Sequence, residues 1–90
     1  MKPYKVKHIP TGLYSQPSKG GNNLSPRGKI YQTRTNPINM GGRDYIGVSV
    51  RDISIVYRQT KAIIPWQKAT GSYREMYYRA PKSDFQIEKL

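Results

Sequence analysis

Apolar residues that can build a core are concentrated in one stretch of this chain, residues 45–66 (YIGVSVRDISIVYRQTKAIIPW). This stretch holds eight of the thirteen Ile and Val residues of the chain and its only Trp. The rest of the sequence is mostly polar, basic, or rich in Gly, Pro, Asn and Ser. Because a chain of 90 residues forms one small domain with a modest core, we expect that core to be centred on this stretch.

The alternation of apolar residues within this stretch changes phase halfway along. From residue 46 to residue 50 every second side chain is Ile or Val, and from residue 53 to residue 57 the apolar side chains fall in the opposite phase. A slip of one residue in a continuous strand would turn every later side chain to the wrong face. The sequence therefore predicts a β-bulge or a sharp bend at Arg51 and Asp52, and Gly47 points to the same distortion.

Shorter strands are expected on both sides of the central stretch. At residues 4–9, Tyr4, Val6 and His8 share one face and two lysines share the other, which is the period of a half-buried strand. Similar alternation, or a high content of β-branched and aromatic residues, predicts further strands at residues 13–14, 29–34, 62–64 and 84–88.

The stretches between these strands are rich in residues that interrupt regular structure. Gly, Pro, Asn and Ser dominate residues 15–28 and 35–43, which are therefore predicted loops. Residues 72–79 fit a helical capping box, but their aromatic content suits a strand, and Pro81 leaves little room for a helix. The overall prediction is all-β: one small domain over residues 1–90, with a sheet or partly open barrel of five to seven short strands and at most one short helix near residues 72–79.

Positive charge dominates the composition. Sixteen Lys and Arg residues stand against 5 Asp and Glu residues, which gives a net charge of +11. Residues 1–43 contain eight basic residues and no acidic one. An electrostatic field of this sign favours binding to a polyanionic partner: nucleic acid, an anionic membrane or an acidic protein surface. The alternative is a soluble protein that is simply basic.

Several function classes find little support in the sequence. The chain has no Cys, which excludes disulfides, a Cys nucleophile and Cys-ligated zinc. No apolar run approaches the roughly 18–20 residues that cross a bilayer, and the first ten residues lack the apolar segment of a signal peptide. The five acidic residues are scattered, and His8, the only histidine, lies on the apolar phase of its strand, where a structural role is expected. We therefore expect no enzymatic activity, no metal and no cofactor.

Tyrosines close to basic residues are the main sign of a binding surface. The chain has eight tyrosines, and most lie near a Lys or Arg. On a sheet, such pairs let bases stack and phosphates meet cations. The stretch from residue 18 to residue 29 adds Gly, Lys, Arg, Asn and Ser, which suit backbone phosphates. The candidate nucleic-acid-binding residues are Lys5, Lys7, Tyr14, Lys19, Arg27, Lys29, Tyr31 and Arg34.

Tyrosines also fill the core of small domains, with only the hydroxyl at the surface. We assign Tyr57 to the core, and Tyr31 is a stacking candidate only if it lies outside the core. Tyr14, Tyr73 and Tyr78 are the better candidates for a contact surface.

Two segments carry a resemblance to a known group of proteins. HIPTGLYSQPS at residues 8–18 and NLSPRGKIYQTR at residues 23–34 resemble segments of small, uncharacterised proteins of tailed bacteriophages. The resemblance covers roughly residues 8–34 and attaches no chemistry to them. It implies a phage context, in which the protein is a virion component or a factor that acts in the infected bacterium.

Two hypotheses of function follow from these observations. The leading one is a non-enzymatic, basic phage protein that binds DNA or RNA mainly through the phosphate backbone. The alternative is a protein-interaction factor, either a virion accessory subunit or an inhibitor of a host or defence protein, which docks on an acidic partner surface or adds residues 29–34 to a partner's sheet. Either protein would act in the cytoplasm of the infected bacterial host or in the virion and not at a membrane. The sequence leaves open the kind of nucleic acid, its strandedness and the oligomeric state.

Overall fold

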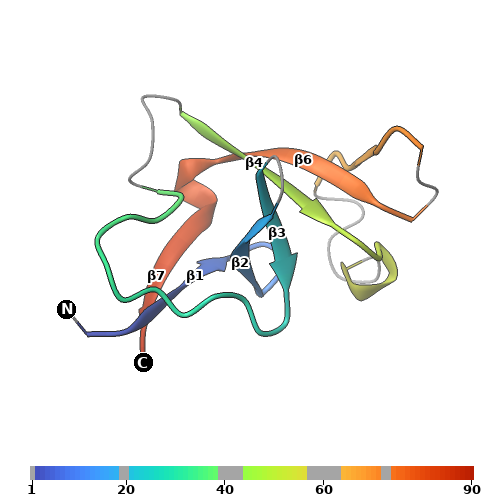
Figure 1. Ribbon diagram of the computed structural model, residues 1–90. Helices are drawn as coiled ribbons and strands as arrows, with labels where there is room; N and C mark the ends of the chain where they lie inside the picture. The colour runs from blue at the N-terminus through green and yellow to red at the C-terminus, as the bar shows by residue number, and fades with distance from the viewer. Residues whose placement is uncertain (1, 19–20, 39–43, 57–63, 72–73) are drawn as a thin grey trace.

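The computed structural model describes residues 2–18, 21–38, 44–56, 64–71 and 74–90. All strands in these residues belong to one mixed β-sheet. The strands lie in the order β5-β6-β4-β3-β2-β1-β7 (Figure 1). Their bounds are β1 Tyr4–His8, β2 Leu13–Ser18, β3 Gly21–Ser25, β4 Tyr45–Val50, β5 Gln67–Lys68, β6 Met76–Pro81 and β7 Phe85–Lys89. The predicted all-β fold is confirmed.

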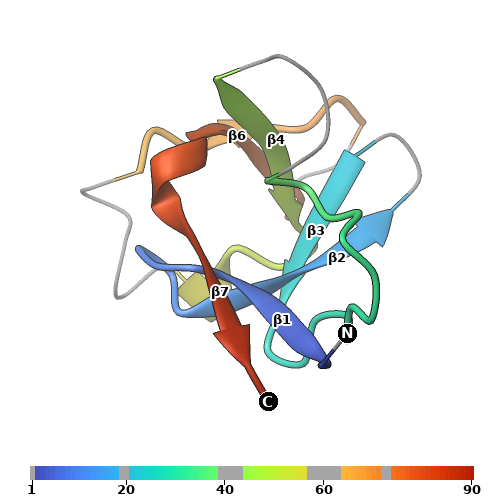
Figure 2. The ribbon, with the colours of Figure 1, turned by 90° about the vertical axis from the view of Figure 1, so that its left-hand side faces the viewer.

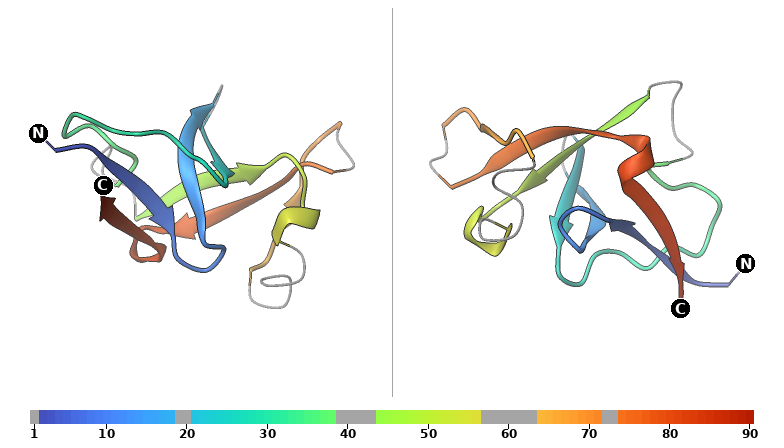
Figure 3. Two further views of the ribbon diagram at one scale, coloured as in Figure 1. Left: turned by 90° about the horizontal axis from the view of Figure 1, so that it is seen from below. Right: turned by 180° about the vertical axis from the view of Figure 1, so that it is seen from behind.

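The sheet curls until its two ends approach each other. β3 and β4 are parallel, and the other neighbouring strands are antiparallel. β6 and β7 are joined only by the 3-10 turn η1 (Lys82–Asp84), yet β6 pairs with β4 while β7 pairs with β1. Figure 2 shows the strands arranged around a ring, and Figure 3 shows β6 continuing through η1 into β7. The corner at η1 therefore joins the two sides of the curled sheet, although no β6–β7 ladder is seen among the described strands.

Backbone hydrogen bonds hold this corner and the chain ends in place. The Ile9 N–H donates to the Asp84 carbonyl at 2.8 Å, and the Lys82 N–H donates to the Asp44 carbonyl at 3.0 Å. The Leu90 N–H donates to the Pro3 carbonyl at 3.1 Å, so the two ends of the chain lie side by side (Figure 1).

The core lies on the inner face of the curled sheet. Tyr4, Val6 and His8 are buried on β1, which confirms the predicted alternation. Residues 45–66 contribute Ile46, Val48, Val50, Val56 and Ile64 to the buried apolar set. The rest of this set comes from elsewhere in the chain: Tyr4, Val6, Leu13, Leu24, Tyr31, Ala80 and Phe85. The core is therefore not confined to residues 45–66, because β1, β2, β3, β6 and β7 also contribute buried apolar residues to it.

The change of phase after β4 is resolved in a different way from the one predicted. The chain bends at Arg51, as expected, but β4 ends at Val50 and residues 54–56 are helical. Asp52 favours this turn, because its Oδ1 accepts from the Ser54 N–H at 3.0 Å and its carbonyl accepts from the Ile55 N–H at 3.1 Å. The prediction of a continuing strand over residues 53–57 is therefore wrong for the part that the structure describes, and Tyr57 lies outside it.

The predicted loop at residues 15–28 is also wrong over most of its length. β2 continues to Ser18, and β3 occupies Gly21–Ser25 opposite it. The polar side chains that favoured a loop bond across the two strands instead. The Ser15 hydroxyl donates to Asn22 Oδ1 at 3.2 Å, and the Ser25 hydroxyl donates to Gln16 Oε1 at 3.0 Å. Polar residues are compatible with a sheet interior when each finds such a partner.

The remaining predictions divide between confirmed and corrected ones. β7 confirms the strand predicted at residues 84–88, and β6 confirms the preference for a strand over a helix near residues 72–79, of which 72 and 73 lie outside the described residues. The strand predicted at residues 29–34 is wrong, because only an isolated bridge joins Tyr31 to Tyr4. Residues 35–38 form no strand, as expected, whereas residues 39–43 and most of the strand predicted at 62–64 lie outside the described part.

Candidate nucleic-acid interface

The outer face of β1 carries two of the predicted binding residues. Because Tyr4, Val6 and His8 point into the core, Lys5 and Lys7 point outward. In the ladders of β1, Lys7 lies opposite Tyr14 on β2, and Lys5 lies opposite Glu88 on β7.

We call these four outward residues the outer basic patch: Lys5, Lys7, Tyr14 and Glu88. Side-chain contacts connect Lys5, Tyr14 and Glu88, and Lys7 lies opposite Tyr14 in the β1–β2 ladder. The Lys5 ammonium lies 4.9 Å from the centre of the Tyr14 ring, in a cation–π contact. The Tyr14 hydroxyl donates to Glu88 Oε1 at 2.8 Å, and this hydrogen bond raises the pKa of the tyrosine hydroxyl above its ordinary value. Three predicted binding residues thus meet on one face, with one acid among them.

This arrangement suits phosphate contacts better than base stacking. The ammonium of Lys5 occupies one face of the Tyr14 ring, and the ring's hydroxyl is bonded to Glu88. Lys5 and Lys7, both partly exposed, present their charges on the same face of β1. The opposite charge of Glu88 lowers the local field but leaves the patch with a net positive charge.

The segment after β3 brings further cations close to this patch. The Lys29 N–H donates to the Ser15 carbonyl of β2 at 3.0 Å. Gly28 has a φ of +66° and packs so tightly on Tyr14 that a Cβ built there would overlap the Cβ of Tyr14. Arg27, Lys29 and Arg34 are exposed on this segment. Lys19, the eighth candidate, lies outside the described residues.

Tyr31 belongs to the core and not to the surface. Its side chain is 4% exposed, and its ring stacks on that of Tyr4 with centroids 5.5 Å apart and planes inclined by 19°. Burial raises the pKa of its hydroxyl, and the Lys29 ammonium lies 5.2 Å from the centre of its ring. Tyr31 was a stacking candidate only if it lay outside the core, so the structure removes it from the candidate stacking residues.

Tyr78 was expected on a contact surface, but its side chain is only partly exposed and faces the core. It lies opposite Val48 in the β4–β6 ladder, packs against the core, and its ring meets Trp66 edge-on at 5.8 Å. Its neighbours Tyr77 and Arg79 point outward instead. Sequence reasoning missed these two residues because it did not fix the register of β6 against β4. Tyr73, the other surface candidate, lies outside the described residues.

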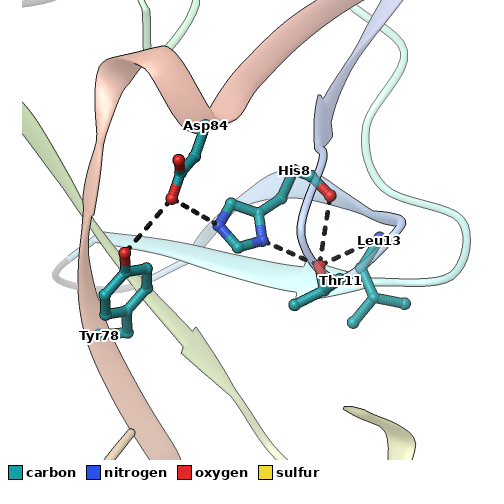
Figure 4. Close-up of polar contacts among 5 residues, drawn as sticks. All are labelled: His8, Thr11, Leu13, Tyr78 and Asp84. Carbon is teal, nitrogen blue, oxygen red and sulfur yellow. Dashed lines mark hydrogen bonds and ion pairs between the residues drawn. The ribbon is translucent and has the colours of Figure 1, made fainter. Parts of the chain in front are cut away.

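A buried polar cluster joins β1, the turn after it, β6 and η1 (Figure 4). His8 is 0% exposed, and its Nδ1 lies 2.9 Å from Thr11 Oγ1, which also accepts from the Leu13 N–H at 3.2 Å. The other ring nitrogen, Nε2, lies 3.8 Å from Asp84 Oδ2, to which the Tyr78 hydroxyl donates at 3.3 Å.

Burial decides the protonation state of this histidine. It lowers the pKa of His8 to about 4, although the charge of Asp84 acts in the opposite direction. The imidazole is therefore neutral near pH 7. Because the ring is closed off from solvent, its contacts tie the turn at Thr11 and the corner at η1 to β1, which is the structural role expected from the sequence.

The part of the chain that the structure describes holds no group of three or more His, Asp or Glu residues that could bind a metal ion. In the same described residues, no helix is long and apolar enough to span a membrane. Comparison of the chain with protein-family models, with curated proteins and with solved structures found no match.

Proposed function

We propose that this protein is a non-enzymatic, basic β-sheet module that binds nucleic acid mainly through the phosphate backbone. The observation that carries the proposal is the pair of lysines, Lys5 and Lys7, held on the outer face of a strand whose other face is in the core. Phosphate contacts need cations and donors in a fixed frame more than they need a shaped pocket.

The surroundings of the patch support this proposal. The Lys29 N–H donates to the carbonyl of Ser15, the residue after Tyr14 on β2. The segment that carries the exposed cations Arg27 and Lys29 is therefore held beside the strand of Tyr14. The chain as a whole carries a net charge of +11, which favours association with any polyanion at low salt. On the resemblance to tailed-phage proteins, the proposed setting is the cytoplasm of an infected bacterium or the virion.

A salt series on matched variants tests the proposal. Lys5→Gln/Lys7→Gln removes two charges from the patch, and Arg51→Gln/Lys89→Gln removes two charges from outside it. Binding to random-sequence DNA and RNA, single- and double-stranded, is measured by fluorescence anisotropy. For the wild type, log K should fall linearly with log salt by roughly 0.7 to 0.9 per phosphate neutralised. The patch variant should lower this slope by about one for each lysine, and the control should lower it less.

Two results would contradict the proposal. One is the absence of binding at low salt, and the other is an equal loss of affinity and slope in the patch variant and its charge-matched control. The second result would mean that binding follows net charge alone, without a defined interface.

A second candidate function, docking on a partner protein, is favoured by the edge of the sheet at β7, which pairs only with β1 among the described strands. β7 ends the sheet next to β1, and Ile87 on it is 44% exposed. An edge strand with an exposed apolar side chain can pair with a strand of a partner. This function requires a partner that remains bound after nuclease treatment, is lost with Ile87→Lys, and is retained with Lys5→Gln/Lys7→Gln.

A further inference from the structure

The outer face of β6 presents an aromatic ring and a cation that the outer basic patch does not include. Tyr78 and Ala80 face inward opposite Val48 and Ile46, so Tyr77 and Arg79 face outward. Tyr77 is 41% exposed, and it is the only exposed one among the tyrosines for which the structure describes a burial.

A hollow lies beside this ring. It has a volume of about 340 Å³ and is lined by Pro65, Gln67, Tyr77, Tyr78 and Arg79. That volume falls within the range of roughly 300–1,000 Å³ that is typical of small-ligand sites. Gln67 of β5 lies opposite Tyr77 in the ladder and supplies an amide that both donates and accepts.

The neighbouring strand leaves the face above Arg79 open. Gly47 of β4 lies opposite Arg79, and a Cβ built on Gly47 would meet nothing within 4 Å. The Arg79 guanidinium lies 5.2 Å from the centre of the Tyr45 ring, and this cation–π contact fixes its position on the outer face.

We propose that this hollow binds an unpaired nucleobase, which stacks on Tyr77 while Arg79 meets the adjoining phosphate. The inference rests on the proposed function and deepens it, because it names single-stranded nucleic acid as the ligand. Every base has a π-face, so stacking on one tyrosine is tolerant of sequence. Residues two apart on a strand lie about 6.6 Å from each other along the backbone, so Tyr77 and Arg79 are neighbours on the outer face of β6. The long Arg79 side chain, which rests on Tyr45, supplies the cation at the Pro81 end of that face. Bases in a duplex are already stacked and paired, so they are not available to this ring.

Charge favours nucleic acid over the other occupant that such a hollow suits, a proline-rich peptide. The lining contains one cation, Arg79, and none of the five lining residues is acidic. The outer basic patch lies on β2, β1 and β7, which β4 and β3 separate from β6 in the sheet order, so the two surfaces can be varied independently.

The chain contains its own reporter for this site. Trp66 is the only tryptophan, and its ring lies 5.8 Å from that of Tyr78, which lines the hollow. A base that enters the hollow should therefore change the emission of Trp66, whereas a phosphate bound only at Lys5 and Lys7 should leave it unchanged.

The test compares Tyr77→Ala with Tyr77→Phe, which keeps the ring. Oligo-dT, oligo-rU and a duplex of equal length are titrated by anisotropy and by Trp66 emission. We expect Tyr77→Ala to weaken single-strand binding by roughly 5- to 150-fold, the range given by the loss of one stacked base. Tyr77→Phe should bind like the wild type, and neither change should alter duplex binding more than about twofold. The dT and rU arms show whether a DNA or an RNA strand of these sequences binds more tightly.

The outcomes separate the inference from the proposed function. If every nucleic acid fails to bind at low salt, the proposed function fails and the inference fails with it. If salt-dependent binding persists but Tyr77→Ala matches Tyr77→Phe on single strands, the inference alone is overturned. It is also overturned if a proline-rich peptide changes Trp66 emission and the oligonucleotides do not.

Discussion

At the level of single residues, the burial of His8 links the stability of the fold to pH. The ring is removed from water, which disfavours its charged form. Its Nδ1 has a partner in Thr11, whereas its Nε2 lies 3.8 Å from Asp84 Oδ2, beyond the distance of a good hydrogen bond. The attraction of Asp84 is therefore too weak to offset the loss of hydration, and the histidine stays neutral until about pH 4.

We expect the free energy of unfolding to fall as the pH decreases from about 6.5 to 4. In this window the unfolded chain binds a proton at His8 and the folded chain does not, so acid favours unfolding. The contribution of His8 is fully present above pH 6.5 and is lost by pH 4, and its size is on the order of 3 kcal/mol. Urea unfolding at several pH values measures it. His8→Gln, which cannot ionise, serves as the control, and an equal pH dependence in both proteins would contradict the prediction.

At the level of elements, local alternation was a sufficient guide where apolar and aromatic residues, with His8 on β1, mark the buried face. β1 and β7 follow from such a pattern. β2 and β3 do not, because Ser15 and Asn23 are buried there, and the Ser15 hydroxyl finds its partner, Asn22, on the opposite strand. A local pattern carries no information about such cross-strand partners. Conversely, residues 29–34 have the composition of a strand, but one bridge to Tyr4 is all the pairing they find.

The turn at Gly28 holds the cationic segment against β2, and its replacement should be costly. Gly28→Ala combines a positive φ with overlap against the Cβ of Tyr14. Gly12→Ala is a matched control, because Gly12 has a φ of +72° but nothing within 4 Å of a built Cβ. We expect about 1 kcal/mol of destabilisation at Gly12 and about 1–3 kcal/mol more at Gly28. Equal losses in urea unfolding would show that the contact with Tyr14 relaxes freely.

At the level of the whole molecule, the candidate site could be predicted only in part. Alternation along β1 was enough to place Lys5 and Lys7 on one face, and the hairpin to β2 added Tyr14. Glu88 joins the patch from 74 residues beyond Tyr14, through the β1–β7 ladder. The outward position of Tyr77 likewise depends on a long-range register with β4. Contacts of this range depend on the topology of the sheet, which the local sequence does not specify.

The same long-range ladder predicts how the fold responds to truncation. β7 pairs with β1 along its full length and buries Phe85, whose ring lies 5.1 Å from that of His8. Loss of one buried Phe side chain alone removes about 3–5 kcal/mol, and a domain of this size has a total stability of roughly 5–13 kcal/mol. Deletion of residues 85–90 also removes the ladder, so we expect the shortened chain to lose its cooperative thermal transition.

Deletion of Leu90 alone is the control, because it removes one hydrogen bond to Pro3 and should lower the stability by about 1 kcal/mol. Near-UV circular dichroism follows both chains, and a cooperative transition in the shorter one would mean that β1 to β6 fold without β7. Loss of the cooperative transition would instead show that β1 to β6 need β7 in order to fold.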